Sequence, residues 1–508
     1  MFFHTSFSSF LIVLNKAIIF ARFKNRFMKN LLASITLILL SVNFLLAQHD
    51  FRFKIDGLND SIVYLANYYG DKMYYNDTAV VQNGGKVVFQ GDEEKHGGVY
   101  AIIMEDKKSY FELVVNEKEI VMETNVEDLT GNMKVIKSEE NKAFYEYIAF
   151  ASDMGKIAQE LSVKIEASSG DQKAKFQAEM DDLNRNGEQY KREYMEKYGN
   201  LFAAKMLEAS REPAVPEFKD ENGKMDDDRR FRYFKQHYFD YIDLSDDRFL
   251  YTPVLDKKLT YYIEKLTAQI PDSICQTSLY LTDQTADTSL IYKYIVQKIT
   301  NTYEESQIMG MDAVFVCMAE NYYTQDKAWW LDTAKLDNIL DLYEVRQNLI
   351  IGEVAENIVL MDPDSNWKSL YDIDAPYTVV VFWSPDCGHC KKELPVLLKS
   401  YHESKETLGF EVFAVGTEFK NNNWKKFISE NELEWINVSD NPEINQNAMK
   451  YIVEGKTTLN SLNFRDFWDI YSTPQVYVLD DRKKIIAKKL AAEQIADFIS
   501  RYDEKKNL

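Results

Sequence analysis

Three zones with different patterns of hydrophobic and polar residues follow an apolar leader. The first zone, residues 48–136, contains short runs such as FRFKIDGL, KVVFQG and YFELVV, which alternate apolar and polar residues and are separated by Gly, Asn and Asp. Alternation with a period of two, interrupted by turn residues, is typical of strands that bury one face. We therefore predict an antiparallel β-sandwich over these residues.

The second zone, residues 137–350, changes to the spacing of long helices and contains very little Gly or Pro. This pattern predicts a helical domain. Four aromatic residues recur there at spacings that line one stripe of a helix. They are Phe231, Phe234, Tyr238 and Tyr241. We expect this stripe to pack in a core rather than to bind a ligand, and the acidic run that begins at Asp226 to mark the start of its helix.

The third zone, residues 351–508, alternates strand and helix patterns, as an open sheet covered by helices does. YTVVVFW is predicted to be a buried strand, and a helix follows it from Gly388. FEVFAVG and WINVS are predicted as further strands, with a helix over NNWKKFISENEL between them. QVYVLD and KIIAKKL predict a hairpin before a last helix. The fold class is therefore multidomain α+β, with a C-terminal α/β domain.

Residues 1–47 read as a leader because they contain five basic residues, no Asp or Glu, and two apolar stretches. From Met28 onward they resemble a secretory signal, so we expect translation to start at Met28 and cleavage near Ala47–Gln48. An uncleaved anchor is the alternative, although its apolar core is short for a membrane span. No Cys follows the core, which argues against a lipid anchor. The prediction is export to the periplasm or cell envelope.

Charge and cysteine content narrow the choice of partners. The net charge is −21 at pH 7, and removal of the basic leader makes it more negative. This sign argues against nucleic acid and anionic lipid as partners. Only four cysteines are present, so the chain is not a disulfide-stapled scaffold. We expect Cys275 and Cys317 to be buried free thiols, with a disulfide between them as the alternative that an oxidising compartment allows.

Cys387 and Cys390 stand three positions apart directly after the predicted buried strand. A zinc site would need a second pair of ligands at similar spacing, and none follows, so we predict no metal. A structural disulfide here would close a very small loop and stabilise little. A helix N-terminus, in contrast, favours the thiolate of Cys387, and His389 adds positive charge when protonated. We therefore expect Cys387 to be a nucleophile and Cys390 to resolve the mixed disulfide.

The segment FWSPDCGHCKKELP resembles the active-site region of thioredoxin-fold thiol–disulfide oxidoreductases of the exported TlpA/ResA-like branch. The resemblance covers about the last third of the chain. It implies that Cys387 and Cys390 are the redox pair and form a reversible disulfide, with Trp383 packing beside them. It also implies that the peptide bond between Thr473 and Pro474 is cis and that these two residues face the pair and contact the substrate. We expect Trp383 and His389 to contact the substrate as well. Backbone next to such a proline can pair with an extended client peptide.

Further positions are assigned by the same resemblance. Glu393 stands where this branch carries an acid that helps to move the proton, and Pro395 where a proline kinks the helix. Val381 takes the place of the buried aspartate of cytosolic thioredoxins, so Glu393 is the natural substitute for it. Asp386 precedes the first cysteine and should oppose thiolate formation somewhat. Gly-His between the cysteines also occurs in protein disulfide isomerases, which suggests a more oxidising pair than Gly-Pro does.

Residues before the third zone resemble a β-rich domain of unknown function and a helical domain that accompany thioredoxin domains in exported bacterial proteins. We therefore expect an exported enzyme without a cofactor that exchanges disulfides with client proteins. The resemblance implies a membrane electron donor and a task such as keeping apocytochrome c cysteines reduced or envelope protein quality control. The alternative is a non-catalytic interaction protein with a thioredoxin-like passenger or sensor domain, and a peroxidase is a weaker third option. The oligomeric state stays open.

Overall fold

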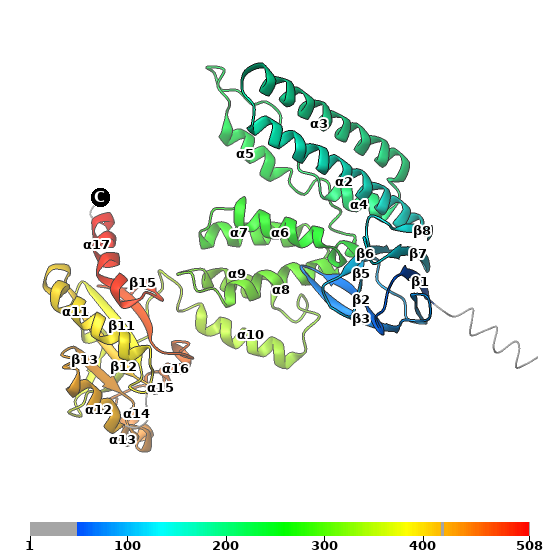
Figure 1. The fold of residues 1–508 in the computed structure, drawn as a ribbon. Helices are drawn as coiled ribbons and strands as arrows, with labels where there is room; N and C mark the ends of the chain where they lie inside the picture. The colour runs from blue at the N-terminus through cyan, green and yellow to red at the C-terminus, as the bar shows by residue number, and fades with distance from the viewer. Residues whose placement is uncertain (1–47, 418–420, 507–508) are drawn as a thin grey trace, which may run out of the picture. The chain divides into compact units, whose positions relative to one another are not determined.

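The computed structural model describes residues 48–417 and 421–506 (Figure 1). Their contacts divide the chain into two compact units. Unit 1 ends at Lys258 and unit 2 starts at Leu259, so the division falls within helix α6 (Pro253–Lys265). The predicted leader, residues 1–47, lies outside the described residues. Within the two described ranges, no helix is both long and apolar enough to cross a membrane.

Unit 1 begins with a β-rich region, as predicted. Its strands are β1 (His49–Asp56), β2 (Ile62–Tyr69), β3 (Lys72–Val80), β4 (Lys86–Gly91), β5 (Gly98–Ile103), β6 (Tyr110–Val115), β7 (Glu119–Asn125) and β8 (Lys134–Lys137). They form two four-stranded sheets, ordered β4-β1-β7-β8 and β3-β2-β5-β6. The apolar residues of alternate positions, such as Phe51 and Phe53 on β1, share one buried core. One strand pair differs from the expected antiparallel arrangement, because β1 and β7 run parallel.

Helices complete unit 1. They are α2 (Glu139–Glu166), α3 (Gly170–Tyr198), α4 (Phe202–Ala209), α5 (Asp227–Gln236) and the short 3-10 helix η1 (Asp247–Tyr251). Asp226 caps α5 by accepting a hydrogen bond from the Arg229 amide at 2.9 Å, so the predicted helix start is confirmed. The aromatic stripe is not one helical face, because α5 ends before Tyr238. The buried Lys258 ammonium donates to the Tyr238 carbonyl at 3.0 Å, a tertiary contact that holds this carbonyl after the helix end. Phe231 is exposed.

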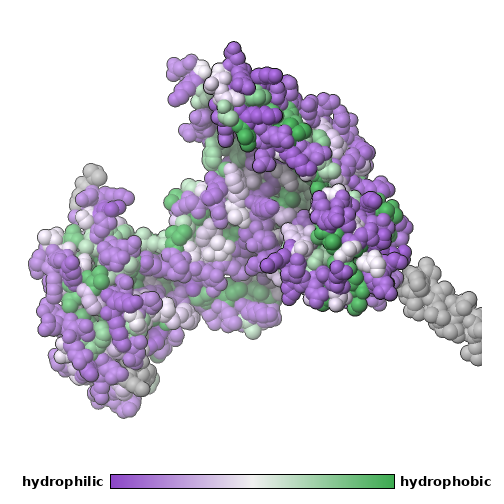
Figure 2. Space-filling view, in the orientation of Figure 1, coloured by the Kyte–Doolittle hydropathy of each residue, from purple (hydrophilic) through white to green (hydrophobic). Residues whose placement is uncertain are grey.

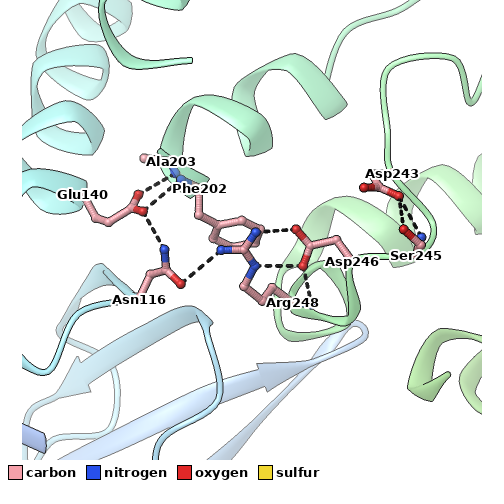
Figure 3. Close-up of polar contacts among 8 residues, drawn as sticks. All are labelled: Asn116, Glu140, Phe202, Ala203, Asp243, Ser245, Asp246 and Arg248. Atoms are coloured by element: carbon pink, nitrogen blue, oxygen red, sulfur yellow. Dashed lines mark hydrogen bonds and ion pairs between the residues drawn. The ribbon is translucent and has the colours of Figure 1, made fainter. Parts of the chain in front are cut away.

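A buried glutamate joins the strands of unit 1 to its helices (Figure 3). The Glu140 carboxylate on α2 accepts hydrogen bonds from the Phe202 and Ala203 amides at 2.9 and 2.8 Å, at the N-terminus of α4. It also accepts one from the Asn116 amide group at 2.7 Å, and Arg248 donates to the Asn116 side-chain oxygen at 3.1 Å. A carboxylate at a helix N-terminus satisfies backbone donors that would otherwise lack partners. The cluster therefore has a structural explanation.

Unit 2 starts with helices α7 (Pro271–Asp283), α8 (Leu290–Glu304), α9 (Asp312–Tyr322) and α10 (Thr333–Arg346). Cys275 on α7 and Cys317 on α9 form a disulfide, with their Cα atoms 6.1 Å apart. The expectation of two free thiols is therefore wrong. The two residues are 42 positions apart in the sequence, and only the packing of α7 against α9 brings their sulfur atoms together.

A seven-stranded sheet follows, in the order β10-β9-β13-β12-β11-β14-β15. The strands are β9 (Val359–Met361), β10 (Trp367–Ser369), β11 (Tyr377–Trp383), β12 (Phe410–Gly416), β13 (Ile436–Ser439), β14 (Gln475–Asp480) and β15 (Ile485–Lys488). β11, β12 and β13 run parallel, and β14 and β15 form the predicted hairpin at one edge. The predicted strands and their α/β alternation are confirmed.

Helices cover both faces of this sheet. They are α11 (Cys390–Leu408), α12 (Asn421–Glu430), α13 (Pro442–Gln446), α14 (Ala448–Val453), α15 (Leu459–Leu462), α16 (Phe464–Phe467) and α17 (Ile495–Lys506). The core on one face combines β11 residues such as Val379 and Val381 with α11, α12 and α17. The core on the other face combines Val380 and Phe382 with α13 to α16. Figure 2 shows a largely hydrophilic visible surface, which agrees with apolar residues gathered in these cores.

Candidate active site

The site lies at the carboxyl end of β11, near the middle of the sheet. All seven residues of β11 are buried, and the strand is paired with β12 on one side and β14 on the other. It ends at Trp383, and α11 begins at Cys390, so the two cysteines lie at the turn from strand to helix. The sequence predicted that this helix starts at Gly388, and in the structure it starts two residues later, at Cys390.

Cys387 is half-buried and Cys390 is fully buried. The Cys390 amide, the first N–H of α11, donates to the Cys387 sulfur at 3.3 Å. The Cys387 thiol donates to the Thr473 carbonyl at 3.1 Å. Both cysteines are free thiols in this structure, so the disulfide between them stays a prediction.

The two thiols have opposite pKa shifts. Burial opposes ionisation of Cys387, but hydrogen bonds from the Cys390 and Thr473 side chains and from backbone amides outweigh it and hold the pKa of Cys387 below its ordinary value. Burial, followed by the hydrogen bond to Cys387, raises the pKa of Cys390 to about 12. The arrangement therefore favours a thiolate at the first cysteine and a protonated thiol at the second.

The segment that faces the cysteines precedes β14. The Thr473–Pro474 peptide bond is cis, as the resemblance implied. Because β14 pairs antiparallel with β11, its first residues lie beside the last residues of β11, with Gln475 opposite Phe382. This pairing places the Thr473 carbonyl within hydrogen-bonding distance of Cys387.

Glu393, His389 and Trp383 have different environments. Glu393 is half-buried, and its carboxylate accepts a hydrogen bond from the Ala492 amide at 2.9 Å. His389 is exposed beside the cysteines. Trp383 is fully buried in the same core as Cys390 and packs on Phe427, with ring centroids 5.2 Å apart. The Trp383 side chain therefore contacts the core rather than a client, and we restrict its proposed role to packing.

A cleft of about 470 Å³ opens beside these residues. His389, Glu393 and Pro474 line it. Residues from elsewhere in unit 2 line it as well, and sequence reasoning missed them. They are Glu304, Gln307, Arg346, Tyr471 and Lys489. Only Tyr471 carried a signal in the sequence, its place three residues before the proline. The others come from the end of α8 and the loop after it, from α10 and from the residue that follows β15.

No three or more His, Cys, Asp or Glu side chains within residues 48–417 and 421–506 are grouped so that they could hold a metal ion. The sequence-based expectation that the site works without a metal stays a prediction.

Comparison with protein families gives matches to three parts of the chain. Residues 351–488 match the AhpC/TSA family. Residues 171–348 and 52–144 match two domains of unknown function, DUF5106 and DUF4369. No curated protein matches the sequence.

Several solved structures are similar to parts of the chain. A domain of a possible thiol–disulfide isomerase from Cytophaga hutchinsonii is 33% identical, covers 31% of this chain and 96% of its own, and has a TM-score of 0.25. The thioredoxin domain of a thiol–disulfide oxidoreductase from Bacteroides vulgatus is 28% identical, with coverage of 30% and 96% and a TM-score of 0.25. A thioredoxin-like protein from Bacteroides caccae is 18% identical, with coverage of 57% and 97% and a TM-score of 0.43.

The sheet order, the cysteine pair between β11 and α11 and the cis-proline before β14 define the C-terminal part of the chain as a thioredoxin-like domain. Together with the family match of that part, these features identify the protein's class. Residues 351–488, which match the AhpC/TSA family, form a domain of the thioredoxin-fold thiol–disulfide oxidoreductase type.

Proposed function

We propose that the protein exchanges disulfides with client proteins through Cys387 and Cys390. The observation that carries this proposal is the opposite pKa shift of two sulfur atoms held together at a helix N-terminus. A lowered pKa provides an attacking thiolate at neutral pH, and a raised pKa keeps the resolving thiol protonated until the mixed disulfide forms. A passenger domain without redox function would not need this difference.

The reaction consists of two exchanges. The Cys387 thiolate attacks one sulfur of a client disulfide, which forms a mixed disulfide and releases the other client sulfur as a thiolate. Cys390 then loses its proton to the Glu393 carboxylate and attacks the Cys387 sulfur, which releases the second client thiolate. The proton passes on to that thiolate. Two electrons have moved from the pair to the client, and a dithiol on a membrane electron donor returns them; the reverse sequence oxidises a client.

We further infer that this chemistry takes place in the periplasm or cell envelope. The leader pattern supports export. The Cys275–Cys317 disulfide supports it independently, because such bonds persist in oxidising compartments and are rare in the cytosol.

Trapping with Cys390→Ala tests the proposal in cells that express the full chain. Without the resolving thiol, Cys387 should stay joined to clients as mixed disulfides that reducing agent releases. The control is Cys387→Ser combined with Cys390→Ala, which keeps the native disulfide in the helices and should capture nothing. Equal capture by the two variants, or no capture by either, would contradict the proposed function.

A further inference from the structure

The cleft beside Cys387 has a second wall that does not come from the α/β part of unit 2. One wall carries Glu393, His389, which is two residues after Cys387, and Pro474, which follows the Thr473 carbonyl that the Cys387 thiol contacts. The other is built by Glu304 at the end of α8 and Gln307 in the loop that follows. A client that enters the cleft to reach Cys387 therefore meets both walls.

Polar contacts fix the second wall in place. The Lys489 ammonium donates to the Ser306 carbonyl at 2.8 Å, which ties the loop after α8 to the end of β15. The Arg346 guanidinium pairs with Asp469 at 2.8 Å and donates to the Glu304 carbonyl at 3.3 Å. The Arg346 and Lys489 side chains of the cleft are thus already engaged with other groups of the protein.

The carboxylates of Glu304 and Glu393 make fewer contacts within the protein. With the residues that the structure describes, the Glu304 carboxylate makes no hydrogen bond or ion pair. Glu393 accepts one backbone hydrogen bond. Tyr471 is 87% exposed and lies at the same cleft, and the face of its ring can attract a cation. An unpaired carboxylate and an exposed aromatic ring are both complementary to a lysine or arginine side chain.

We propose that the cleft selects an extended client segment that carries a lysine or arginine close to its cysteine, with Glu304 as the recognition residue on the second wall. This inference rests on the proposed function. It adds the chemical class of the client segment, and it gives the helices of unit 2 a role in recognising that segment. The cleft contacts the substrate on the path to Cys387, so Glu304 determines specificity and takes no part in the exchange itself.

The test uses the reduced full chain and three peptides of equal length. Each peptide holds one cysteine in a disulfide with 5-thio-2-nitrobenzoate, flanked by lysines, glutamines or glutamates, and release of the coloured thiolate reports the exchange rate. We expect the lysine peptide to react up to about fivefold faster than the glutamine peptide, as for a partly exposed ion pair. The glutamate peptide should be the slowest.

The variant Glu304→Lys should abolish or invert this preference, and Glu304→Gln should reduce it. The matched control is Glu305→Lys, which makes the same change of charge at the neighbouring exposed residue and should keep the preference.

Equal rates for the three peptides, or equal effects of Glu304→Lys and Glu305→Lys, would overturn this inference and leave the proposed function intact. Absence of exchange with every peptide would overturn both. A last comparison uses oxidised glutathione. If it reacts faster than the peptides, and if Glu304→Lys does not change its rate, the cleft serves small disulfides and the inference is overturned.

Discussion

At the scale of single residues, the proposed chemistry depends on a few hydrogen bonds to one sulfur atom. Burial alone would raise the pKa of Cys387, and the side chain of Cys390 makes the largest contribution in the other direction. In the proposed mechanism, Cys390 therefore has two tasks. It closes the disulfide, and before that it stabilises the thiolate that starts the reaction.

Alkylation of the reduced protein as a function of pH tests this second task. We expect the midpoint for Cys387 to lie below about 8.5, the value of an ordinary cysteine, because alkylation requires the thiolate. Cys390 should stay unmodified up to at least pH 9, since its pKa is about 12. Cys390→Ala should raise the Cys387 midpoint, whereas Cys390→Ser keeps a donor and should raise it less. Mass spectrometry that finds Cys390 modified first would contradict the assignment of roles.

Residue identity and local spacing could predict most of this site. A Cys-X-X-Cys pair after a buried strand needs only local structure, and the Thr473–Pro474 segment is recognisable by its resemblance to a family. Glu304 could not be found in this way. It lies 83 residues before Cys387 in the sequence, at the end of a helix without a recognisable motif. Only the packing of α8 near β15 brings it to the cleft.

At the scale of elements, β15 shows how tertiary packing changes the meaning of a pattern. It is an edge strand, and a lysine on an edge strand is normally a solvated residue. Lys488 instead has a side chain that is only 4% exposed and pairs with Asp312 in the first turn of α9, whose side chain is 9% exposed. The ammonium also donates to the Leu349 carbonyl. The edge is thus closed by backbone hydrogen bonds of Ile485 with Gly352 and Glu353 and by this buried ion pair.

Removal of one partner of this pair should be costly. Lys488→Met leaves the Asp312 carboxylate buried without its counter-charge, and we expect a loss of about 3–5 kcal/mol in the free energy of unfolding. The double variant Lys488→Met with Asp312→Leu should recover most of that loss, because no charge stays buried. Urea unfolding gives both values. The control Lys399→Met breaks an exposed pair with Glu403 and should cost less than about 1 kcal/mol. A loss of that small size for Lys488→Met would show that the pair is not buried in solution.

Strand and helix predictions succeeded where one face of an element is buried and failed where burial is weak. β3 was not recognised as a separate strand, because most of its residues are exposed and no apolar alternation marks it. The predicted aromatic stripe extended too far, because α5 ends at Gln236, before Tyr238. The spacing of the aromatic residues could not reveal the contact of Lys258 with the Tyr238 carbonyl.

At the scale of the whole molecule, the compact units do not follow the zones of the sequence. The helical zone reads as continuous over residues 137–350, yet α2 to α5 belong to unit 1 and α7 to α10 to unit 2. Helical periodicity reports which residues share a face and carries no information about the partner of that face. The helices of unit 2 share buried contacts with the sheet, such as that of Asp312 with Lys488.

Two fragments test this division. Residues 253–508 contain the whole of α6 and all of unit 2, and we expect them to fold cooperatively and keep the reactivity of Cys387. Residues 351–508 lack Asp312, Arg346 and the Leu349 carbonyl, so Lys488 and Asp469 lose their partners. We expect the shorter fragment to unfold at a clearly lower urea concentration, by at least about 3 kcal/mol, because a buried charge is left unpaired. Equal free energies of unfolding for the two fragments would show that the helices are independent of the sheet.

The sequence by itself determined the order of the β, helical and α/β zones, the strands of the C-terminal sheet and the proposed redox pair Cys387 and Cys390. Each of these depends on periodicity or on neighbours within one or two turns. Only the tertiary structure decided the Cys275–Cys317 disulfide, the burial of Lys488 and the approach of Glu304 to the cleft. Those features join residues that are distant in the sequence, and the packing of elements, which no local pattern encodes, determines their separation.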